Sequence, residues 1–318
     1  MITTIPYAGW SRCLRMTNGT IDLIATTEVG PRIIRFGFND GPNEFVEYPD
    51  QMGKTGGETY RSYGGHRLWV APETDGWTNH PDNGAVTALE QDGSVVLTAG
   101  VEEGSRLQKQ MRVTFLPAQT GVRVEHVVTN RGDRPVRLAP WALSVMAAGG
   151  TAVIPHEPYL PHAEKVLPAR PMAVWHYTDM TDPRWTWGRR LAFLRQEAGA
   201  TTPQKFGALI SSGWAAYHNG DRVFVKRFPF DPEASYPDFG VNAEFFTNAR
   251  MLEVESLGAL VALEPGHAVS HVEHWYLFRN VAPAANEEDW LRILTELVQH
   301  TRQPDPPDRE ARTHRDDI

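Results

Sequence analysis

The sequence predicts an all-β protein of antiparallel strands with one C-terminal helix. Apolar and polar residues alternate with period two along most of the 318 residues, as in the run RLQKQMRVTFL that begins at Arg106. Such alternation is typical of strands with one buried face. Clusters of Gly, Pro, Asn and Asp separate these runs, and only one segment has helical spacing. The resulting series of about seventeen strands favours a sandwich or barrel over a fold built from βαβ units.

The expected strands follow one another along both halves of the chain. Turn-forming residues at 130–135 and at 264–266 predict two hairpins, which pair 121–129 with 136–146 and 251–263 with 268–278. The segments between 206 and 228 predict a meander with glycines at its turns. The main expected strands are 20–27, 32–38, 44–48, 95–98, 106–116, 121–129, 136–146, 206–211, 214–218, 222–228, 251–263 and 268–278.

The single helix is expected to begin after Asn286. An Asn side chain is a favourable helix N-cap, and three acidic residues follow it in the first turn. The apolar residues then recur at helical spacing and form one stripe, which predicts that the helix packs on the outside of a sheet. These residues are Trp290, Ile293, Leu294, Leu297 and Val298.

Two segments depart from the strand rhythm. The region 155–200 is rich in Pro, Trp and Arg, and a long irregular insertion of this kind in a β protein predicts a lid or rim over a site. The tail 303–318 is polar and nearly free of apolar residues, so we expect it to be disordered. We expect residues 1–302 to form a single domain.

The composition restricts the partners. A net charge of −8 and the absence of a long basic block disfavour nucleic acid and anionic membranes. The sequence has no run of about 18 apolar residues and no signal-peptide pattern. A lone cysteine, Cys13, excludes an internal disulfide and any multi-cysteine metal site. We therefore expect a cytoplasmic monomer or homodimer that uses no cofactor and no metal.

The segment GGHRLWVAPE, residues 64–73, is the first candidate site. In an extended strand Arg67 and Trp69 point to one face, and His66 and Leu68 point to the other. An indole beside a guanidinium and the carboxylate of Glu73 suits a polyhydroxylated ring. The alternative is a β-hairpin with Trp69 in the core and Arg67 paired to Glu73, and this segment alone leaves both open.

The segment NARMLEVESLG, residues 248–258, is the second candidate. Glu253 and Glu255 share one face of a strand, and Leu252 and Val254 occupy the other. Two neighbouring carboxylates tend to raise one pKa, which suits a general acid or base. The alternative is a solvated strand whose glutamates pair with Arg or Lys on a neighbouring strand.

Other side chains are candidates for contacts with a ligand. Trp141 suits stacking on a sugar or a place in the core. A carboxylate or phosphate would suit Arg67, Lys205, Lys226 and Arg227, although alternation allows only one of the last two to face a cleft. Asn83 and Asp238 suit hydrogen bonds to hydroxyls or ordinary turns. His271 and His274 point to opposite faces, which argues against a joint metal site.

Several motifs, in this order, resemble those of the galactose mutarotase-like superfamily. The run EVGPRIIRF from Glu28 is similar to its early G-x-R-I strand, and MLEVE from Met251 is similar to its C-L-E-T-Q strand. LEPG from Leu263 and HVEHW from His271 resemble its closing hairpin. The segments 64–73, 81–83, 141–144 and 236–240 more narrowly resemble an uncharacterised, domain-of-unknown-function branch.

The resemblance implies a large two-sheet supersandwich and places the family's catalytic base at Glu253. The family's general acid is a histidine in a central strand, but the corresponding strand here, PWALS from Pro140, has none. His66 is then the best candidate acid, ahead of His80, His156, His176 and His271.

Three functions follow. The first is an aldose 1-epimerase that uses Glu253 as base, with His66 as the acid. The second is a non-catalytic carbohydrate-binding protein that uses the same concave face. The third, a glycoside hydrolase or lyase, fits two glutamates on one strand poorly, because hydrolysis needs carboxylates on opposite sides of the bond.

Overall fold

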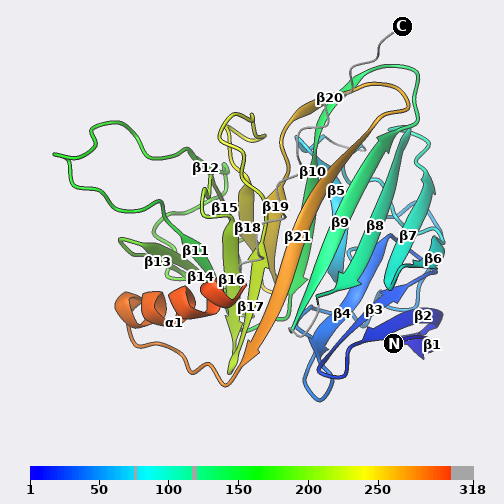
Figure 1. Cartoon of the computed structure of the whole chain (residues 1–318), viewed down its shortest axis with the longest axis horizontal. Coiled ribbons are helices and arrows are strands. Elements are labelled where there is room, and N and C mark those ends of the chain that lie inside the picture. The colour runs from blue at the N-terminus through cyan, green and yellow to red at the C-terminus, as the bar shows by residue number, and fades with distance from the viewer. Residues whose placement is uncertain (75–76, 117–119, 302–318) are drawn as a thin grey trace, which may run out of the picture.

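The computed structural model describes residues 1–74, 77–116 and 120–301, and two antiparallel sheets dominate them (Figure 1). The predicted disordered tail lies outside the described residues. In order, the eleven-stranded sheet contains β1 (Ile2–Tyr7), β2 (Trp10–Thr17), β3 (Ile21–Thr26), β4 (Arg32–Phe38), β5 (Gly65–Ala71), β10 (Val136–Met146), β19 (Leu252–Leu257), β18 (Ala243–Thr247), β15 (Gln204–Ala208) and β12 (Met172–Val174), with β20 (Val261–Leu263) beside β10.

The ten-stranded sheet packs against it, and apolar side chains from both sheets form the main core. Its strands in order are β13 (Trp185–Trp187), β14 (Leu191–Arg195), β11 (Thr151–Pro155), β16 (Trp214–Asn219), β17 (Arg222–Arg227), β21 (Ala268–Arg279), β9 (Gly121–Asn130), β8 (Leu107–Phe115), β7 (Ser94–Val101) and β6 (Thr87–Gln91). The predicted all-β sandwich is confirmed.

The helix is also as predicted. It spans Glu287–His300 as α1, and the Asn286 side chain accepts a hydrogen bond from the amide of Asp289 at 3.0 Å. Leu294 is buried in a cluster with Val153 and Tyr276 on the outer face of the ten-stranded sheet (Figure 1). No helix within the described ranges is long and apolar enough to cross a membrane.

The predicted hairpins are wrong. β9 and β10, on either side of the 130–135 turn, lie in different sheets, and so do β20 and β21. The predicted meander is split in the same way, because β15 belongs to one sheet and the β16–β17 hairpin to the other. A turn after an alternating strand has the same local sequence pattern whether the chain folds back beside that strand or crosses to the facing sheet. Only the long-range pairing of strands distinguishes the two arrangements.

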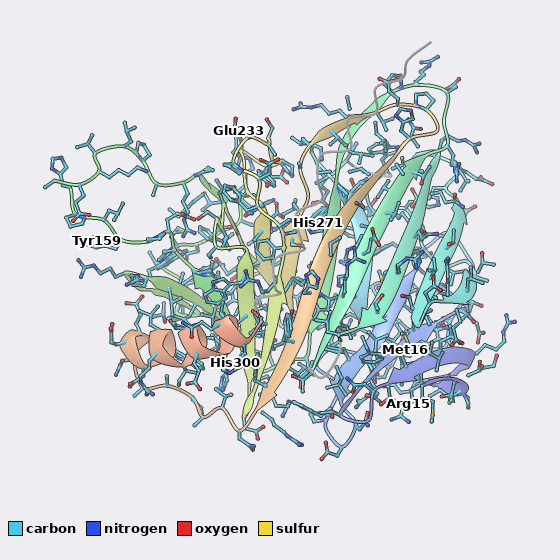
Figure 2. The ribbon with its side chains drawn as sticks, in the orientation of Figure 1. Arg15, Met16, Tyr159, Glu233, His271 and His300 are labelled. Atoms are coloured by element: carbon cyan, nitrogen blue, oxygen red, sulfur yellow. The ribbon has the colours of Figure 1, made fainter. Side chains whose placement is uncertain are left out.

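Two further expectations need correction. Residues 44–48 form isolated bridges at Phe45 and Glu47 rather than a strand. The region 155–200 contains three short strands, β12 to β14, at the sheet edges. Between β11 and β12 the chain forms an irregular loop that projects from the sheets, with Tyr159 on it (Figure 2).

Six buried polar residues lie between the sheets, and we call them the interior polar cluster. Lys226 Nζ lies 2.8 Å from Glu273 Oε1 and donates to the backbone carbonyl of Val254 at 2.9 Å. Ser256 donates to the same carboxylate oxygen at 2.6 Å. Because Lys226 and Glu273 belong to one sheet and β19 to the other, these bonds join the sheets. The cluster consists of His66, His126, Lys226, Ser256, His271 and Glu273.

The hydrogen bonds of two histidines assign their tautomers. His126 Nδ1 lies 3.1 Å from the backbone carbonyl of His271, so it must donate and leave Nε2 as an acceptor. His66 Nε2, at 2.7 Å, therefore donates to His126, and His66 Nδ1 accepts from the Ser144 hydroxyl. Burial lowers the pKa of His126 to about 3 and that of His66 well below its usual value. Both imidazoles are thus neutral.

Removing the cation of the cluster is expected to destabilise the fold. Lys226→Met leaves the Glu273 carboxylate buried without its counter-ion, so the free energy of unfolding should fall by about 3–5 kcal/mol. Chemical denaturation measures this loss. The double variant Lys226→Met/Glu273→Gln, which removes the charge but keeps hydrogen-bonding groups, should recover most of it. A Lys226→Met protein as stable as the wild type would contradict this role.

Stability is also expected to fall in mild acid. Burial holds the pKa of His126 and of His271 at about 3, below the ordinary 6.5, so the unfolded chain takes up protons first. The free energy of unfolding should therefore decrease as pH falls below about 6.5, by up to about 1.4 kcal/mol per pH unit for each histidine. Urea denaturation from pH 7 to pH 5 measures the slope. His126→Gln should reduce it, whereas His162→Gln, at an exposed position, should not.

Candidate active site on the eleven-stranded sheet

A cavity of about 320 Å³ lies on the face of the eleven-stranded sheet that points away from the ten-stranded sheet. Adjacent strands β5, β10, β19, β18 and β15 contribute side chains to it, and the 39–64 segment and the residues after β12 complete its walls. It is lined by Tyr48, Gln51, Tyr60, Ser62, Arg67, Trp69, Glu73, Trp141, Leu143, Tyr177, Lys205, Phe246, Asn248, Arg250, Met251 and Glu253.

Strand alternation selects these side chains. On β5, Arg67 and Trp69 line the cavity while Leu68 packs in the main core. On β19, Glu253 lines the cavity while Leu252 and Val254 are core residues. The two predicted facial assignments are therefore correct, and the alternative of a solvated β19 is excluded because this strand is buried throughout.

Glu253 is held at one oxygen. Arg67 Nη2 donates to its Oε1 at 2.8 Å, whereas Oε2 has no hydrogen bond within the described residues. The residue is only 6% exposed. Burial raises the pKa of Glu253; Glu255 adds to this rise, and the charges of Arg67 and Lys205 oppose it. A carboxylate with a raised pKa and one free oxygen suits a general base.

Aromatic rings form the wall beside Arg67. Its guanidinium lies 4.4 Å from the centre of the Trp69 ring, and Trp69 meets Trp141 edge-on at 5.5 Å. Tyr60 also packs against Trp69, with ring centres 5.7 Å apart. These rings fix the position of Arg67 and give the cavity a flat apolar surface.

Glu255 lies beneath the cavity rather than in its lining. Trp141 Nε1 donates to its Oε2 at 2.7 Å, and Lys205 Nζ lies 3.6 Å from the same oxygen. The residue is fully buried. Its direct access to a ligand is therefore blocked, and Glu255 instead holds Trp141 and Lys205 in place.

Lys205 occupies the opposite wall. Its ammonium lies 2.8 Å from Glu244 and 4.6 Å from the ring centres of both Trp141 and Trp175. Trp175 and the cavity-lining Tyr177 come from the 155–200 region, so part of this region forms the rim of the cavity. The sequence named Lys205 as a candidate for contact with a ligand, and the structure places it in the cavity lining.

Two predicted site residues lie between the two sheets and not in the cavity. His66 belongs to the interior polar cluster and does not share the cavity with Glu253. His66 and Arg67 are neighbours on β5, so their side chains point to opposite faces of the sheet. Because Arg67 lines the cavity, His66 points into the space between the sheets. Lys226 likewise points between the sheets, where it binds Glu273. The expected cleft shared by His66 and Glu253 does not form.

Some of the remaining predicted residues line the cavity and others do not. Glu73 and Trp141 line the cavity. Asn83 does not: it accepts a hydrogen bond from Tyr63 at 2.8 Å and donates to two backbone carbonyls, so it holds a turn. Asp238 also lies outside the lining, at a left-handed φ of 48° in a turn.

Ten of the sixteen lining residues were not among the predicted site residues. Alternation in β18 places Phe246 on the same face as Glu244, which the local sequence could have shown. No local pattern, however, shows that β18 pairs with β19. Tyr48, Gln51, Tyr60 and Ser62 lie in an irregular segment without a period to interpret.

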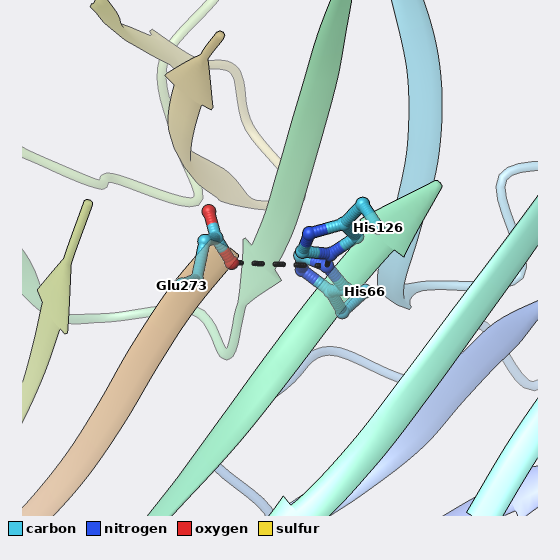
Figure 3. A group of neighbouring side chains, drawn as sticks. All are labelled: His66, His126 and Glu273. Carbon is cyan, nitrogen blue, oxygen red and sulfur yellow. Dashed lines mark hydrogen bonds and ion pairs between the residues drawn. The ribbon is translucent and has the colours of Figure 1, made fainter. Parts of the chain in front are cut away.

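One group of possible metal ligands occurs among the described residues: His66, His126 and Glu273, whose ligand atoms lie within 4.8 Å of one another (Figure 3). Each imidazole nitrogen of the pair already has a hydrogen-bond partner, and the Lys226 ammonium is 2.8 Å from the carboxylate. These contacts satisfy the group as a hydrogen-bonded cluster, and we assign it no ligand.

Sequence comparisons give no family for this chain: no protein-family model matches it, and no curated protein matches it. Solved structures do resemble it. A candidate aldose 1-epimerase from Klebsiella pneumoniae superposes with a TM-score of 0.61 at 12% identity, over 93% of this chain and 86% of that one.

Two further structures superpose over the whole of the other chain. A galactose mutarotase related enzyme from Lactobacillus acidophilus has a TM-score of 0.54 at 8% identity, over 86% of this chain and 100% of that one. A galactose mutarotase-like protein from Lactobacillus casei has a TM-score of 0.53 at 11% identity, over 84% and 100%. The chain therefore has the galactose mutarotase-like fold that its motifs predicted.

Proposed function

We propose that this protein interconverts the anomers of an aldose, with Glu253 as the general base. The observation that carries the proposal is the position of Glu253 in the cavity lining, with Arg67 on one oxygen and the other oxygen free. The fold is shared with structures described as aldose 1-epimerase or mutarotase related, which supports the same reaction class.

The reaction needs a base and an acid but no cofactor. Glu253 Oε2 removes the proton of the anomeric hydroxyl, the C1–O1 bond becomes a carbonyl, and the bond from C1 to the ring oxygen breaks. The ring oxygen takes up a proton. Rotation about the C1–C2 bond and the reverse proton transfers close the ring on the other face, so no proton is consumed overall.

The rest of the lining suits a sugar ring. Trp69 and Trp141 offer apolar faces, while Gln51, Asn248 and Glu73 offer hydrogen-bonding groups for hydroxyls. The cations Arg67 and Lys205 are already paired with carboxylates. We therefore favour an uncharged aldose over a phosphorylated or acidic one.

The alternative is a non-catalytic sugar-binding protein that uses the same cavity. One observation favours it: no histidine is among the residues that line this cavity. Such a protein would bind an aldose without accelerating the exchange of its anomers.

Glu253→Gln is the decisive variant. Removing the base should lower the rate of anomer exchange by about 10²–10⁴-fold, since this is the usual contribution of a general base. Proton NMR on freshly dissolved single anomers of hexoses and pentoses measures the rate. Glu90→Gln, an exposed change on the distant edge strand β6, is the matched control and should leave the rate unchanged. A Glu253→Gln protein with the wild-type rate would remove Glu253 from the mechanism.

The acid side of the pH profile should report the same carboxylate. Glu253 must be ionised to act, so the rate should fall as pH drops through its pKa, which burial raises above the ordinary 4.5. Arg67 on β5, Glu255 on β19, Lys205 on β15 and the phenols Tyr48 and Tyr60 are the titratable or charged groups around it. Arg67→Met, which removes a cation that lowers this pKa, should shift the fall to higher pH. A profile unchanged by Arg67→Met would argue against this assignment.

A further inference from the structure

The proposed reaction needs a proton donor for the ring oxygen, and the cavity offers few. His66 lies on the other side of the sheet. Arginine keeps its proton in proteins, which excludes Arg67 and Arg250 as acids. Apart from the base and these arginines, the ionisable groups of the lining are Glu73, Tyr48, Tyr60, Tyr177 and Lys205. Glu73 is exposed in the segment after β5, unlike the buried Lys205.

The strand register separates these donors by wall. Lys205 is paired with Phe246, and Phe246 is paired with Glu253, so the three residues form one row across β15, β18 and β19. The backbones of Lys205 and Glu253 are thus about 10 Å apart, two strand spacings. Both side chains and Phe246 between them line the cavity. A sugar ring over Phe246 would have the base on one side and the ammonium on the other.

Tyr48 and Tyr60 are on the side of the base. The charges of Arg67 and Glu253 influence the pKa of both phenols, and Tyr60 packs against Trp69 on β5. Tyr177 is on the side of Lys205, but this residue is 43% exposed in the segment after β12. Lys205 is only 6% exposed and is held between two indoles and two carboxyl groups. It is the better-positioned donor on that wall.

We propose that Lys205 is the acid that protonates the ring oxygen, since no histidine is among the residues that line the cavity. This inference rests on the proposed anomer exchange. As the bond between C1 and the ring oxygen breaks, its electron pair stays on the oxygen, which takes a proton from Lys205 Nζ. Ring closure returns this proton to the amine, while Glu253 returns its proton to O1.

The charges around Lys205 determine its protonation state. Burial alone would lower the pKa of Lys205, but Glu255 and Glu244 outweigh burial and raise it above the ordinary range. Glu253 acts in the same direction, and Trp141, Trp175 and Tyr177 complete its surroundings. The ammonium therefore remains protonated at neutral and mildly alkaline pH, and it donates only to an oxygen as basic as the alkoxide formed by ring opening.

The test compares Lys205→Arg and Lys205→Ala with the wild type on an aldose that the wild type converts. Arginine keeps the cation and its pairing with Glu244 but does not release a proton, so kcat should fall by about 100-fold or more with KM nearly unchanged. Adding ethylammonium should restore part of the rate of Lys205→Ala above the buffer reaction, but not that of Glu253→Gln. Tyr177→Phe is the matched control for the other donor on that wall.

The outcomes separate the two proposals. A wild-type rate that stays flat from neutral to mildly alkaline pH, together with loss in Lys205→Arg and rescue of Lys205→Ala, supports Lys205. Full activity of Lys205→Arg, or loss in Tyr177→Phe with none in Lys205→Arg, overturns this inference and leaves anomer exchange standing. A wild-type protein that accelerates the exchange of no aldose overturns the proposed function and this inference with it.

Discussion

The structure depends on one buried ammonium, that of Lys226, at the point where the two sheets meet. Lys226 Nζ binds Glu273 in its own sheet at 2.8 Å and the carbonyl of Val254 in the other sheet at 2.9 Å. Val254 lies between Glu253 and Glu255 on β19. The Lys226 ammonium inside the sandwich thus holds β19, the strand that carries the proposed base. The geometry of the cavity on the outer face therefore depends on this contact in the core.

The cavity itself is built from paired charges rather than free ones. Arg67 pairs with Glu253, the proposed base, and Lys205 pairs with Glu244. The aromatic rings of Trp69 and Trp141 keep these pairs partly dry, which strengthens their interaction. A neutral sugar adds no charge to these pairs when it binds, so only the proton transfers change the charge distribution in the cavity.

Local periodicity predicted the fold class, the helix and the faces of β5 and β19, because each depends only on neighbouring residues. It could not predict strand partners, so the strands around the 130–135 turn were paired although they lie in different sheets. For the same reason it could not show that β17 belongs to the ten-stranded sheet, where neither of its faces borders the cavity, so Lys226 was wrongly placed in the site. For His66 the error was avoidable, because the alternation that places Arg67 in the cavity excludes its neighbour.

The most direct measurement is a crystal structure of the Glu253→Gln variant with an aldose that the wild-type protein converts. We expect a sugar ring over Phe246, with its anomeric hydroxyl at hydrogen-bond distance from the side chain of residue 253 and its ring oxygen directed toward Lys205. A sugar bound elsewhere, or one whose anomeric carbon points away from residue 253, would contradict this expectation.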